Sequence, residues 1–476
     1  MAGSVQGSPG FDLQPSSEQV ALSSNYITNF DFLNQYLPDT YEKEFERYGN
    51  RTVASFLRLV GAEMPSNSDL IKWAEQGRLH TKYTNVTTPT AAAADTAVWT
   101  IGDVLVPGSG SVAVRVGQTV MLTRNTGGAN LKALVTSVDT AAGTVVLAYY
   151  GANHTGVAAE KYTMFIYGSE FKKGTPGMVG SLEADDVFFE NKPIILKDRY
   201  AVSGSDMAQI GWVEVTTENG ASGYLWYLKS EHETRLRFDD YLETSMLEAV
   251  PAIQNSGAAA ALGNAGAANT GAGSEGIFYV VNQRGNVWSG GNPNVLGDFD
   301  SIIQRLDKQG SIEENVIFVD RQFGFDIDDM LAAQNSYGAG GTSYGLFDND
   351  QEMALNLGFT GFRRGYDFYK SDWKYLNDPT MRGGLPSGSG SGRINGLMVP
   401  AGSTSVYDQI LGKNAKRPFL HVRYRASETE DRRYKTWITG SAGGAQTSSL
   451  DAMEVNFLSE RAVCTLGANN FFIFEE

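Results

Sequence analysis

A short segment that predicts its own small fold is the feature that most constrains this chain of 476 residues. Between Val116 and Tyr150, three runs of β-branched and apolar residues predict short strands joined by the turns RNTGGAN and DTAAG. Gly127, Gly128 and Gly143 stand where these turns favour a positive φ. The chain before this segment predicts helices, and the chain after it predicts long β-ribbons and a charged helix. One fold therefore interrupts another.

The sequence on either side of this module indicates how the chain accommodates it. A Thr/Ala-rich stretch, NVTTPTAAAADTA, leads into the module, which we expect to end near Tyr162. Residues 171–220 then alternate short β-branched and aromatic runs with Gly, Asn and Asp turns, which predicts a long hairpin or ribbon. Insertions are tolerated best at exposed loop tips. We therefore expect the module to be inserted at the tip of this ribbon.

A long charged helix is predicted over Tyr224–Val250, where apolar residues recur near helical spacing and the pattern stops before Pro251. At 1.5 Å per residue this helix is about 40 Å long, which is unusual in a globular domain. The flank of the helix carries two predicted i,i+4 ion pairs, Glu231 with Arg235 and Glu233 with Arg237.

Other segments of the chain predict a polar arm at the start and alternating β and α elements after the long helix. Residues 1–29 offer little to a core, and residues 30–83 predict short helices, one of them N-capped by Ser68 and closed by Gly77. The alternation favours a mixed sheet with flanking helices, ending in a β-rich return. The predicted strands are Ile277–Val281, Asn315–Asp320, Leu420–Arg425, Met453–Phe457 and a C-terminal strand, and the predicted helices lie at Asp298–Gly310 and Asp326–Gln334.

Composition excludes several classes of protein. The 38 Lys and Arg residues against 54 Asp and Glu residues give a net charge of -16, which disfavours a protein that grips phosphate backbones. Cys464 is the only cysteine, so an intrachain disulfide and zinc sites of several thiolates are excluded. The start of the chain lacks the pattern of a signal peptide, and no run reaches the roughly 18 apolar residues of a membrane span. We expect a cytoplasmic product without a membrane partner.

No motif in the sequence predicts catalysis. The four histidines are scattered without metal-ligand spacing. GAGSEG, Gly271–Gly276, matches GxGxxG, but it precedes a predicted strand, whereas dinucleotide binding requires a following helix. The acidic run DNDQE at 348–352 lacks the spacing of a calcium loop. We therefore predict no catalytic, cofactor-binding or metal-binding residue, no cofactor, and a protein that is not an enzyme.

Charged clusters are the candidate functional residues that remain. The pairs Lys172–Lys173 and Arg432–Arg433 are consistent either with solvated turns or with salt bridges between subunits. Opposite charges alternate at the predicted hairpin tip before Arg432, which favours the second interpretation slightly. The candidate intersubunit contacts are Lys172, Lys173, Glu231, Glu233, Arg235, Arg237, Arg432 and Arg433.

The order of elements, together with several sequence segments, resembles the major capsid proteins of tailed bacteriophages with the Hong-Kong-97-type fold. Four segments look most like capsid proteins of crAss-like and related marine phages: EFKKGTPGMVGSLEADD, SGSDMAQIGWVEVTTENGASGYLWYLKSEHETRLRFDDYLE, GFRRGYDFYKSDWKYLND and DAMEVNFLSERAVCTLGANNFFIF. The resemblance covers essentially the whole chain. It implies an α+β fold with an N-arm, an extended β-ribbon loop carrying an inserted β-domain, a peripheral domain with a long spine helix, and an axial domain with a mixed sheet.

The resemblance also implies an organisation into regions. These are an N-terminal arm with short helices at 1–83, an extended loop at 84–220 with the inserted β-domain at about 88–162, the spine helix and start of the peripheral domain at 221–290, a mainly axial region at 291–420, and a β-rich return at 421–476. Some family members carry a long charged scaffolding segment at the N-terminus, which this sequence lacks. The resemblance therefore implies a separate scaffolding protein.

The function implied by the resemblance is structural. The chain would self-assemble as hexamers and pentamers into an icosahedral head that encloses double-stranded DNA without sequence-specific binding. Its partners would be itself, a scaffolding protein, a portal and head-decoration proteins, and its place would be the virion capsid after assembly in the host bacterial cytoplasm. Two alternatives remain open: an encapsulin-like compartment, and a β-rich carbohydrate-binding protein or hydrolase, for which the 7 Trp, 22 Tyr and 24 Phe residues argue.

Overall fold

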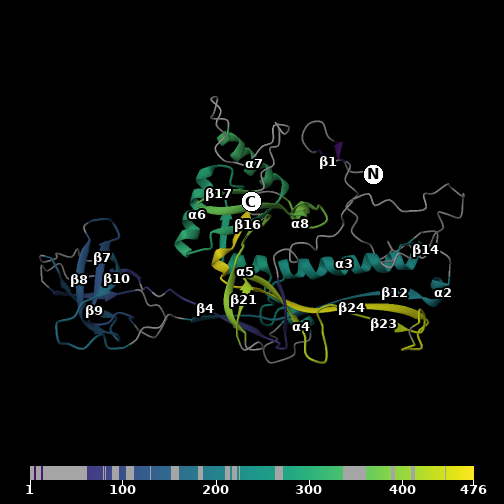
Figure 1. The fold of residues 1–476 in the computed structure, drawn as a ribbon, viewed down its shortest axis with the longest axis horizontal. Helices are drawn as coiled ribbons and strands as arrows, with labels where there is room; N and C mark the ends of the chain where they lie inside the picture. The colour runs from purple at the N-terminus through teal and green to yellow at the C-terminus, as the bar shows by residue number, and fades with distance from the viewer. Residues whose placement is uncertain are drawn as a thin grey trace. The chain divides into compact units, whose positions relative to one another are not determined.

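The chain divides into two compact units in the computed structural model, which we call the body and the barrel unit (Figure 1). The body comprises Met1–Lys72 and Glu190–Glu476, and the barrel unit comprises Trp73–Phe189. The structure describes residues 62–78, 80, 82–87, 96–102, 112–128, 130–151, 160–180, 186–208, 226–262, 272–335, 361–386, 392–408, 413–444 and 446–476, together with the two-residue strands β1 (Val5–Gln6), β2 (Asp12–Leu13), β13 (Val215–Thr216) and β14 (Ser222–Gly223).

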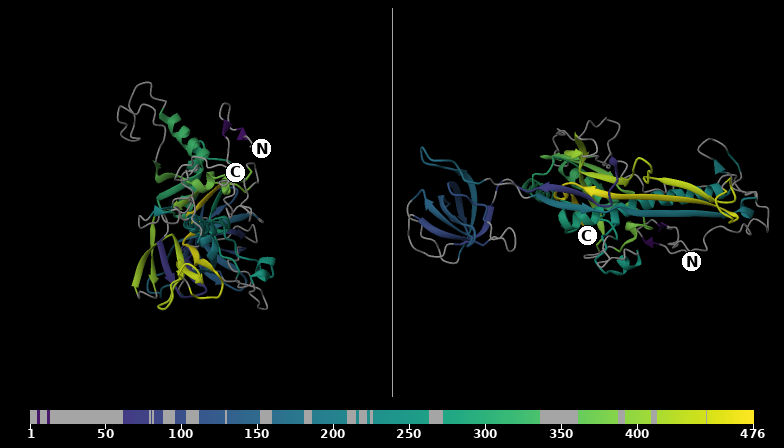
Figure 2. Two further views of the ribbon diagram at one scale, coloured as in Figure 1. Left: turned by 90° about the vertical axis from the view of Figure 1, so that its right-hand side faces the viewer. Right: turned by 90° about the horizontal axis from the view of Figure 1, so that it is seen from below.

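Six antiparallel strands of the barrel unit close on themselves in the order β10-β5-β6-β9-β8-β7 (Figure 2). Alternate residues of each strand point inward, and Tyr83 and Met164 are among the fully buried ones. The Trp99 indole donates a hydrogen bond of 2.8 Å to the Tyr149 hydroxyl, and its ring meets Tyr162 edge-on at 4.9 Å. The strands are β5 (Lys82–Thr87), β6 (Thr96–Ile101), β7 (Gln118–Arg124), β8 (Leu131–Asp139), β9 (Thr144–Tyr149) and β10 (Lys161–Ser169).

The predicted β-module is confirmed within this barrel as strands β7, β8 and β9. Gly127, Gly128 and Gly143 have φ values of 94°, 142° and 66°, as the turns require. The closed barrel runs from Lys82 to Ser169, which is wider at both ends than the predicted 88–162. The reason is that closure depends on pairing between the first and last strands, β5 and β10, which the local turn signals do not reveal.

A two-stranded ribbon carries the chain from the body to the barrel unit and back. Strand β4 (Ile71–Gln76) pairs with β11 (Asp186–Asn191), and Trp73 contacts Phe189 with ring centroids 6.3 Å apart. The helix predicted between Ser68 and Gly77 is therefore wrong. The Ser68 hydroxyl closes a short turn instead, and cross-strand pairing outweighs the weak helical preference of the residues that follow.

The predicted long helix is confirmed as α3 (Trp226–Glu248), which lies along a five-stranded sheet of the body (Figure 1). Phe238 and Leu242 of this helix are buried against Tyr200, Val455 and Phe457 of the sheet. The strand order is β12-β24-β22-β3, with β23 also paired to β24. The strands are β3 (Ala62–Ser66), β12 (Ile194–Ser203), β22 (Leu420–Arg425), β23 (Lys435–Gly440) and β24 (Ala452–Thr465).

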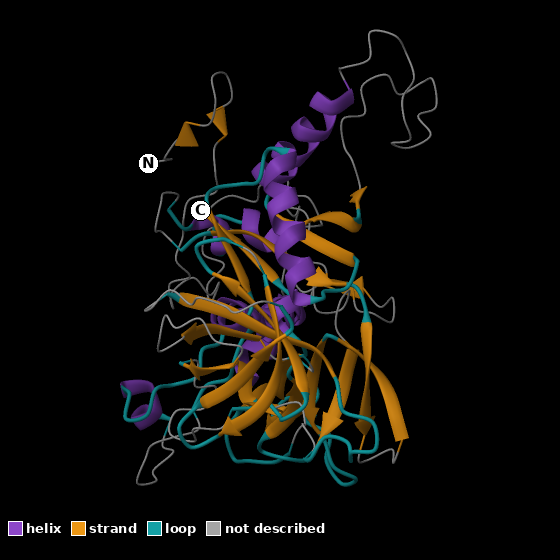
Figure 3. Cartoon of the chain, turned by 90° about the vertical axis from the view of Figure 1, so that its left-hand side faces the viewer, coloured by secondary structure: helices purple, strands orange, loops and turns teal. Residues whose placement is uncertain are grey.

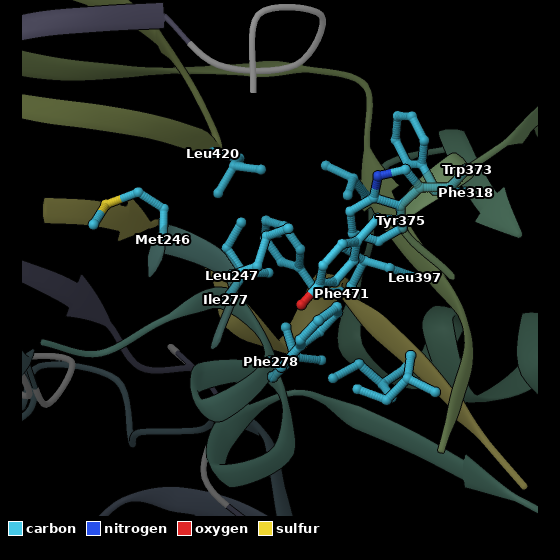
Figure 4. Close-up of a cluster of buried hydrophobic side chains, with 14 of the residues drawn as sticks. Met246, Leu247, Ile277, Phe278, Phe318, Trp373, Tyr375, Leu397, Leu420 and Phe471 are labelled. Carbon is cyan, nitrogen blue, oxygen red and sulfur yellow. The ribbon is translucent and has the colours of Figure 1, made fainter. Parts of the chain in front are cut away.

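The predicted mixed sheet is also confirmed, with six strands in the order β15-β25-β19-β16-β18-β17. Helices α6 and α7 cover one face with Phe299 and Phe323, while α5 contributes Phe278 to the other face beside Leu397 and Phe471 (Figure 4). The elements are α5 (Ile277–Arg284), α6 (Leu296–Gln309), α7 (Arg321–Asn335), β15 (Asn286–Ser289), β16 (Glu314–Val319), β17 (Gly361–Arg364), β18 (Tyr366–Asp372), β19 (Ile394–Pro400) and β25 (Phe472–Glu475).

One strand predicted in this region is wrong, because Ile277–Val281 forms the start of helix α5. A short apolar run does not distinguish a buried helix from a buried strand. The GxGxxG match therefore does precede a helix. Its last glycine, Gly276, donates its amide to the Ala249 carbonyl at 2.8 Å, and a Cβ there would lie 2.7 Å from the Ala249 backbone. The Gly276 amide at the start of α5 is thus already bonded to the chain just after α3.

The α+β class predicted from the sequence is confirmed, and Figure 3 shows both kinds of element in the chain. The remaining short elements are α2 (Gly204–Met207), α4 (Gly257–Ala261), α8 (Lys374–Asn377), η2 (Arg382–Gly384), η3 (Ala468–Asn470), β20 (Ser403–Asp408) and β21 (Lys413–Pro418). Most of the predicted N-arm and the DNDQE turn lie outside the described residues.

Candidate functional site

The ribbon of β4 and β11 exposes large apolar side chains although it has only two strands. Phe188 is 71% exposed and Val187 is 47% exposed. A lone two-stranded sheet is only marginally stable in water. An ordered ribbon with such side chains is typical of a surface that a neighbouring molecule covers.

The base of the ribbon is held to the body by a buried asparagine at the end of β11. Asn191 donates to the carbonyls of Val463 and Glu275 at 2.7 and 3.0 Å. Its side-chain oxygen accepts from the Ser274 hydroxyl at 2.9 Å and from the Glu275 amide at 2.8 Å. One side chain therefore joins β11, β24 and the loop before α5. This arrangement anchors the end of β11 within the body.

The C-terminal end of α3 is held by a charged network. The Glu248 carboxylate accepts from Arg382 at 2.6 and 3.1 Å and from the Tyr375 hydroxyl at 2.7 Å. The Arg382 guanidinium also lies over the Phe278 ring, 4.9 Å from its centroid. Burial, reinforced by the hydrogen bond to Glu248, raises the pKa of Tyr375, so its hydroxyl remains a donor at neutral pH. The long helix is thereby fastened to the segment that leads into β19.

The predicted lysine pair lies in an exposed turn after β10. Lys172 and Lys173 are both exposed, and neither forms an ion pair with a described residue. The Lys172 carbonyl accepts from the Thr175 hydroxyl at 2.7 Å and from its amide at 3.3 Å, which orders the turn. Both lysine side chains remain available to another molecule.

One of the two predicted ion pairs on α3, Glu233 with Arg237, is not formed. Glu233 pairs with Lys229 at 3.7 Å, whereas Arg237 is exposed and pairs with no described carboxylate. An exposed ion pair contributes little free energy, so the spacing of opposite charges alone does not determine which pair forms. Burial raises the pKa of Glu231, while the nearby Arg235 and His232 act in the opposite direction.

Arg432 and Arg433 are held by partners within their own chain. Arg432 pairs with Glu460 at 3.0 Å, and Arg433 pairs with Glu63. The buried Arg461 shares Glu63 at 3.4 Å and donates to the Arg433 carbonyl at 3.0 Å. Burial lowers the pKa of Arg461, and Glu63 offsets part of that effect. These pairs join β3, β24 and the loop before β23. Whether the two arginines also contact another subunit stays a prediction.

Sequence reasoning missed the groups that hold these surfaces in place. Asn191, Glu248 and Glu63 each bind residues far away along the chain, and no local spacing indicates such partners. Among the described residues, no cluster of three or more His, Cys, Asp or Glu side chains could hold a metal ion. No described helix is long and apolar enough to cross a membrane. Cys464 is buried in β24, where burial raises the pKa of its thiol to about 12.

Comparison with known proteins gives matches at the level of structure only. No protein-family model and no curated protein sequence matches the chain. A solved structure from Microbacterium phage Oxtober96 is 10% identical, with 92% of this chain and 96% of that chain covered and a TM-score of 0.39. The capsid structure of Cyanophage P-SCSP1u is 8% identical over 65% of this chain and 79% of that chain, with a TM-score of 0.33. The SrpI encapsulin complex of Synechococcus elongatus is 10% identical over 61% and 77%, also with a TM-score of 0.33.

Proposed function

We propose that this chain is the major capsid protein of a tailed bacteriophage of the Hong-Kong-97 type, a shell subunit without enzymatic activity. Copies assemble as hexamers and pentamers into an icosahedral head around double-stranded DNA. The single observation that carries the proposal is the ordered two-stranded ribbon with Phe188 exposed on it, because a subunit that works alone gains nothing from that surface.

The arrangement of the other elements supports the same role. The long helix α3 packs along the sheet that contains β12 and β24, and a separate mixed sheet is covered by helices on both faces. This is the combination that the sequence resemblance implies for peripheral and axial regions. Heterologous contacts between such subunits close into rings when the rotation between them allows it.

Charge supports the enclosure of DNA without tight binding. The net charge of -16 makes a wall of many copies repel packaged phosphate rather than hold it. A separate scaffolding protein, a portal and head-decoration proteins are the partners that this role requires. In this proposal the subunit assembles in the host bacterial cytoplasm and remains in the virion.

The test is assembly of the full chain with and without a phage scaffolding protein, followed by sedimentation velocity and negative-stain electron microscopy. Wild-type protein should form shells or capsomer rings. Phe188→Asp should raise the concentration needed for assembly at least tenfold, because burying one Phe side chain contributes about 1.5–3 kcal/mol per contact. Val295→Asp is the matched control, since Val295 is 52% exposed at the start of α6, where Asp is a favourable N-cap.

The outcomes separate the proposal from its alternatives. A wild-type chain that stays monomeric with scaffold present contradicts it, as does equal assembly by the Phe188→Asp and wild-type proteins. Shells that hold protein cargo and no nuclease-resistant DNA when isolated from infected cells would indicate an encapsulin-like compartment. Turnover of a carbohydrate or ester by the monomer would favour a hydrolase.

A further inference from the structure

The outer surface of the barrel unit carries an ordered row of side chains that the proposed shell role does not explain. Phe165 of β10 lies opposite Lys82 of β5 on one side and Met121 of β7 on the other. Met121 in turn lies opposite Lys132 of β8. Directly paired residues in neighbouring strands point to the same face. Tyr167 lies in a bulge of β10, and its contact with Lys132 places a second ring on this face.

We call these five residues the aromatic row. Its rings are accessible, since Phe165 is 36% and Tyr167 is 47% exposed. The Lys132 ammonium lies 5.6 Å from the centre of the Tyr167 ring, which is cation–π geometry. With strands about 4.8 Å apart, the four strands present a face about 14 Å wide. Lysines stand at both ends, and apolar side chains fill the middle.

The charges around the aromatic row leave its two lysines uncompensated. Neither Lys82 nor Lys132 forms an ion pair with any residue that the structure describes. The two carboxylates that flank β10 are engaged elsewhere, because Glu170 accepts from the Tyr150 hydroxyl and Glu160 pairs with Arg124 at 2.5 Å. The face is therefore cationic at its rim.

The two units differ in net charge in a way that matches this face. The barrel unit, Trp73–Phe189, contains eight Lys and Arg residues and nine Asp and Glu residues, which gives a charge of -1. The rest of the chain contains thirty and forty-five, which gives -15. A cationic face on a nearly neutral module is thus complementary to the acidic body of another copy.

We propose that the aromatic row docks onto an acidic surface of the body of a second copy of this chain. Phe165, Tyr167 and Met121 form the apolar centre of the contact, and Lys82 and Lys132 form its charged rim. Aromatic residues and Met are enriched at the centres of protein interfaces, with charged groups at the rim. A single-stranded nucleic acid is the less favoured occupant, because it needs a continuous cationic groove and the row has only two lysines. This inference rests on the proposed self-assembly.

The first experiment identifies the contact directly in assembled full-length protein. Equal amounts of natural-abundance and ¹⁵N-labelled chains are assembled together and treated with a carbodiimide, which joins amines to carboxylates that already touch. Mass spectrometry should find mixed-isotope links from Lys82 or Lys132 to Asp or Glu residues within 190–476. Links from these lysines that join only chains of the same isotope composition, or no links from them while Lys161 is linked, would overturn the proposal.

The second experiment uses the double variant Lys82→Glu/Lys132→Glu and the variant Phe165→Thr. Each should raise the concentration needed for assembly about tenfold, the size expected for loss of a central interface contact. Lys197→Glu, at an exposed position of β12 outside the candidate contacts, is the control for charge, and Val98→Thr, at an exposed position of β6, is the control for loss of an apolar side chain. The thermal midpoint of each variant should stay at the wild-type value.

The outcomes distinguish this inference from the proposed function. If wild-type and all row variants assemble equally, the shell role stands and the docking of the aromatic row is wrong. If the row variants assemble normally but lose binding of a fluorescent single-stranded oligonucleotide, the row binds nucleic acid and the inference is also wrong. If wild-type protein does not self-associate under any condition, both proposals fail together.

Discussion

The barrel unit and the body achieve stability in different ways. The barrel closes within one continuous segment, Lys82–Ser169, and every strand pairs with others from that segment. The body is closed by strands from distant parts of the chain, since β12 pairs with β24 from Ser203 opposite Ala452 to Ile194 opposite Arg461. Closing long loops costs conformational entropy and slows folding. The inserted barrel can therefore fold from its own segment alone, whereas the body depends on contacts between distant parts of the chain.

This contrast predicts separate unfolding of the two units, and the largest effect is expected in the barrel core. Trp99→Ala removes a fully buried ring and its hydrogen bond to Tyr149. The free energy of unfolding of the barrel should fall by about 4 kcal/mol. Hydrogen exchange with mass spectrometry should show faster exchange across β5 to β10 and an unchanged body.

Val98→Ala is the control for this change, because Val98 is the neighbour of Trp99 on β6 and is 44% exposed. It should leave the exchange of the barrel near the wild-type rate. Faster exchange in β12 and β24 of the Trp99→Ala protein would show that the two units unfold together and would contradict the comparison.

Removal of a buried polar side chain in the body should weaken several elements that are far apart in the sequence. Asn191→Ala leaves the carbonyls of Val463 and Glu275 and the Glu275 amide without their side-chain partner. Each buried unpaired group costs about 1–3 kcal/mol, so the body should lose about 3 kcal/mol of unfolding free energy in urea titrations. Protection should fall in β11, β24 and the loop before α5 together.

The matched control is Asn294→Ala at an exposed position before α6, which should change the urea midpoint very little. If Asn191→Ala weakened only the exchange protection of β11, then the ribbon would be attached to the body by other contacts and the long-range role of Asn191 would be refuted.

Acid should weaken the body more than the barrel because of His421. Burial, helped by Arg423 and Arg417, lowers the pKa of this imidazole to about 4 from an ordinary value of 6.5. Between about pH 6.5 and about pH 4, this imidazole is protonated in the unfolded chain but neutral in the folded body. The free energy of unfolding of the body therefore falls as the pH drops through this range. The full difference is at most about 3 kcal/mol.

His421→Gln should flatten this slope in urea titrations between pH 7 and pH 4. The control is His80→Gln in the barrel unit, where the histidine is exposed. An unchanged acid slope in His421→Gln would assign the acid sensitivity of the body to other groups.

The same contrast explains how much of this molecule could be predicted from sequence. Turn glycines such as Gly128 and Gly143 and alternating strands are local signals, so the β-module and the long helix were predictable. The strand at β4 was not, because its partner β11 lies more than a hundred residues away. The apolar run at Ile277 was ambiguous for the same reason, since only the packed end of α3 decides that it is helical.

The candidate contact residues also show that long-range partners could not be predicted from the sequence. Lys172 and Lys173 were predictable as exposed charges, because a Gly-containing polar turn follows a strand there. The partners of Arg433 were not predictable, because Glu63 and Arg461 reach it only after β3, β22 and β24 have paired. Charge clusters in a sequence locate ionic groups but do not tell whether the partner belongs to the same chain.

The smallest expected effect concerns the ribbon, where the two regions of the chain meet covalently. Lys72 and Glu190 form an ion pair of 3.1 Å across β4 and β11, and both side chains are more than half exposed. Exposed pairs contribute about 0–1 kcal/mol and are screened by salt. Glu190→Gln should therefore shift the urea midpoint of the body by an amount that disappears at about 1 M salt, where the Debye length is about 3 Å. Suppose instead that Glu190→Gln lowered the free energy of unfolding of the body as much as Asn191→Ala does, and that this loss persisted in high salt. The ion pair, rather than the buried Asn191 amide, would then hold the ribbon. The contrast between a self-sufficient barrel and a body that depends on buried long-range contacts would be wrong.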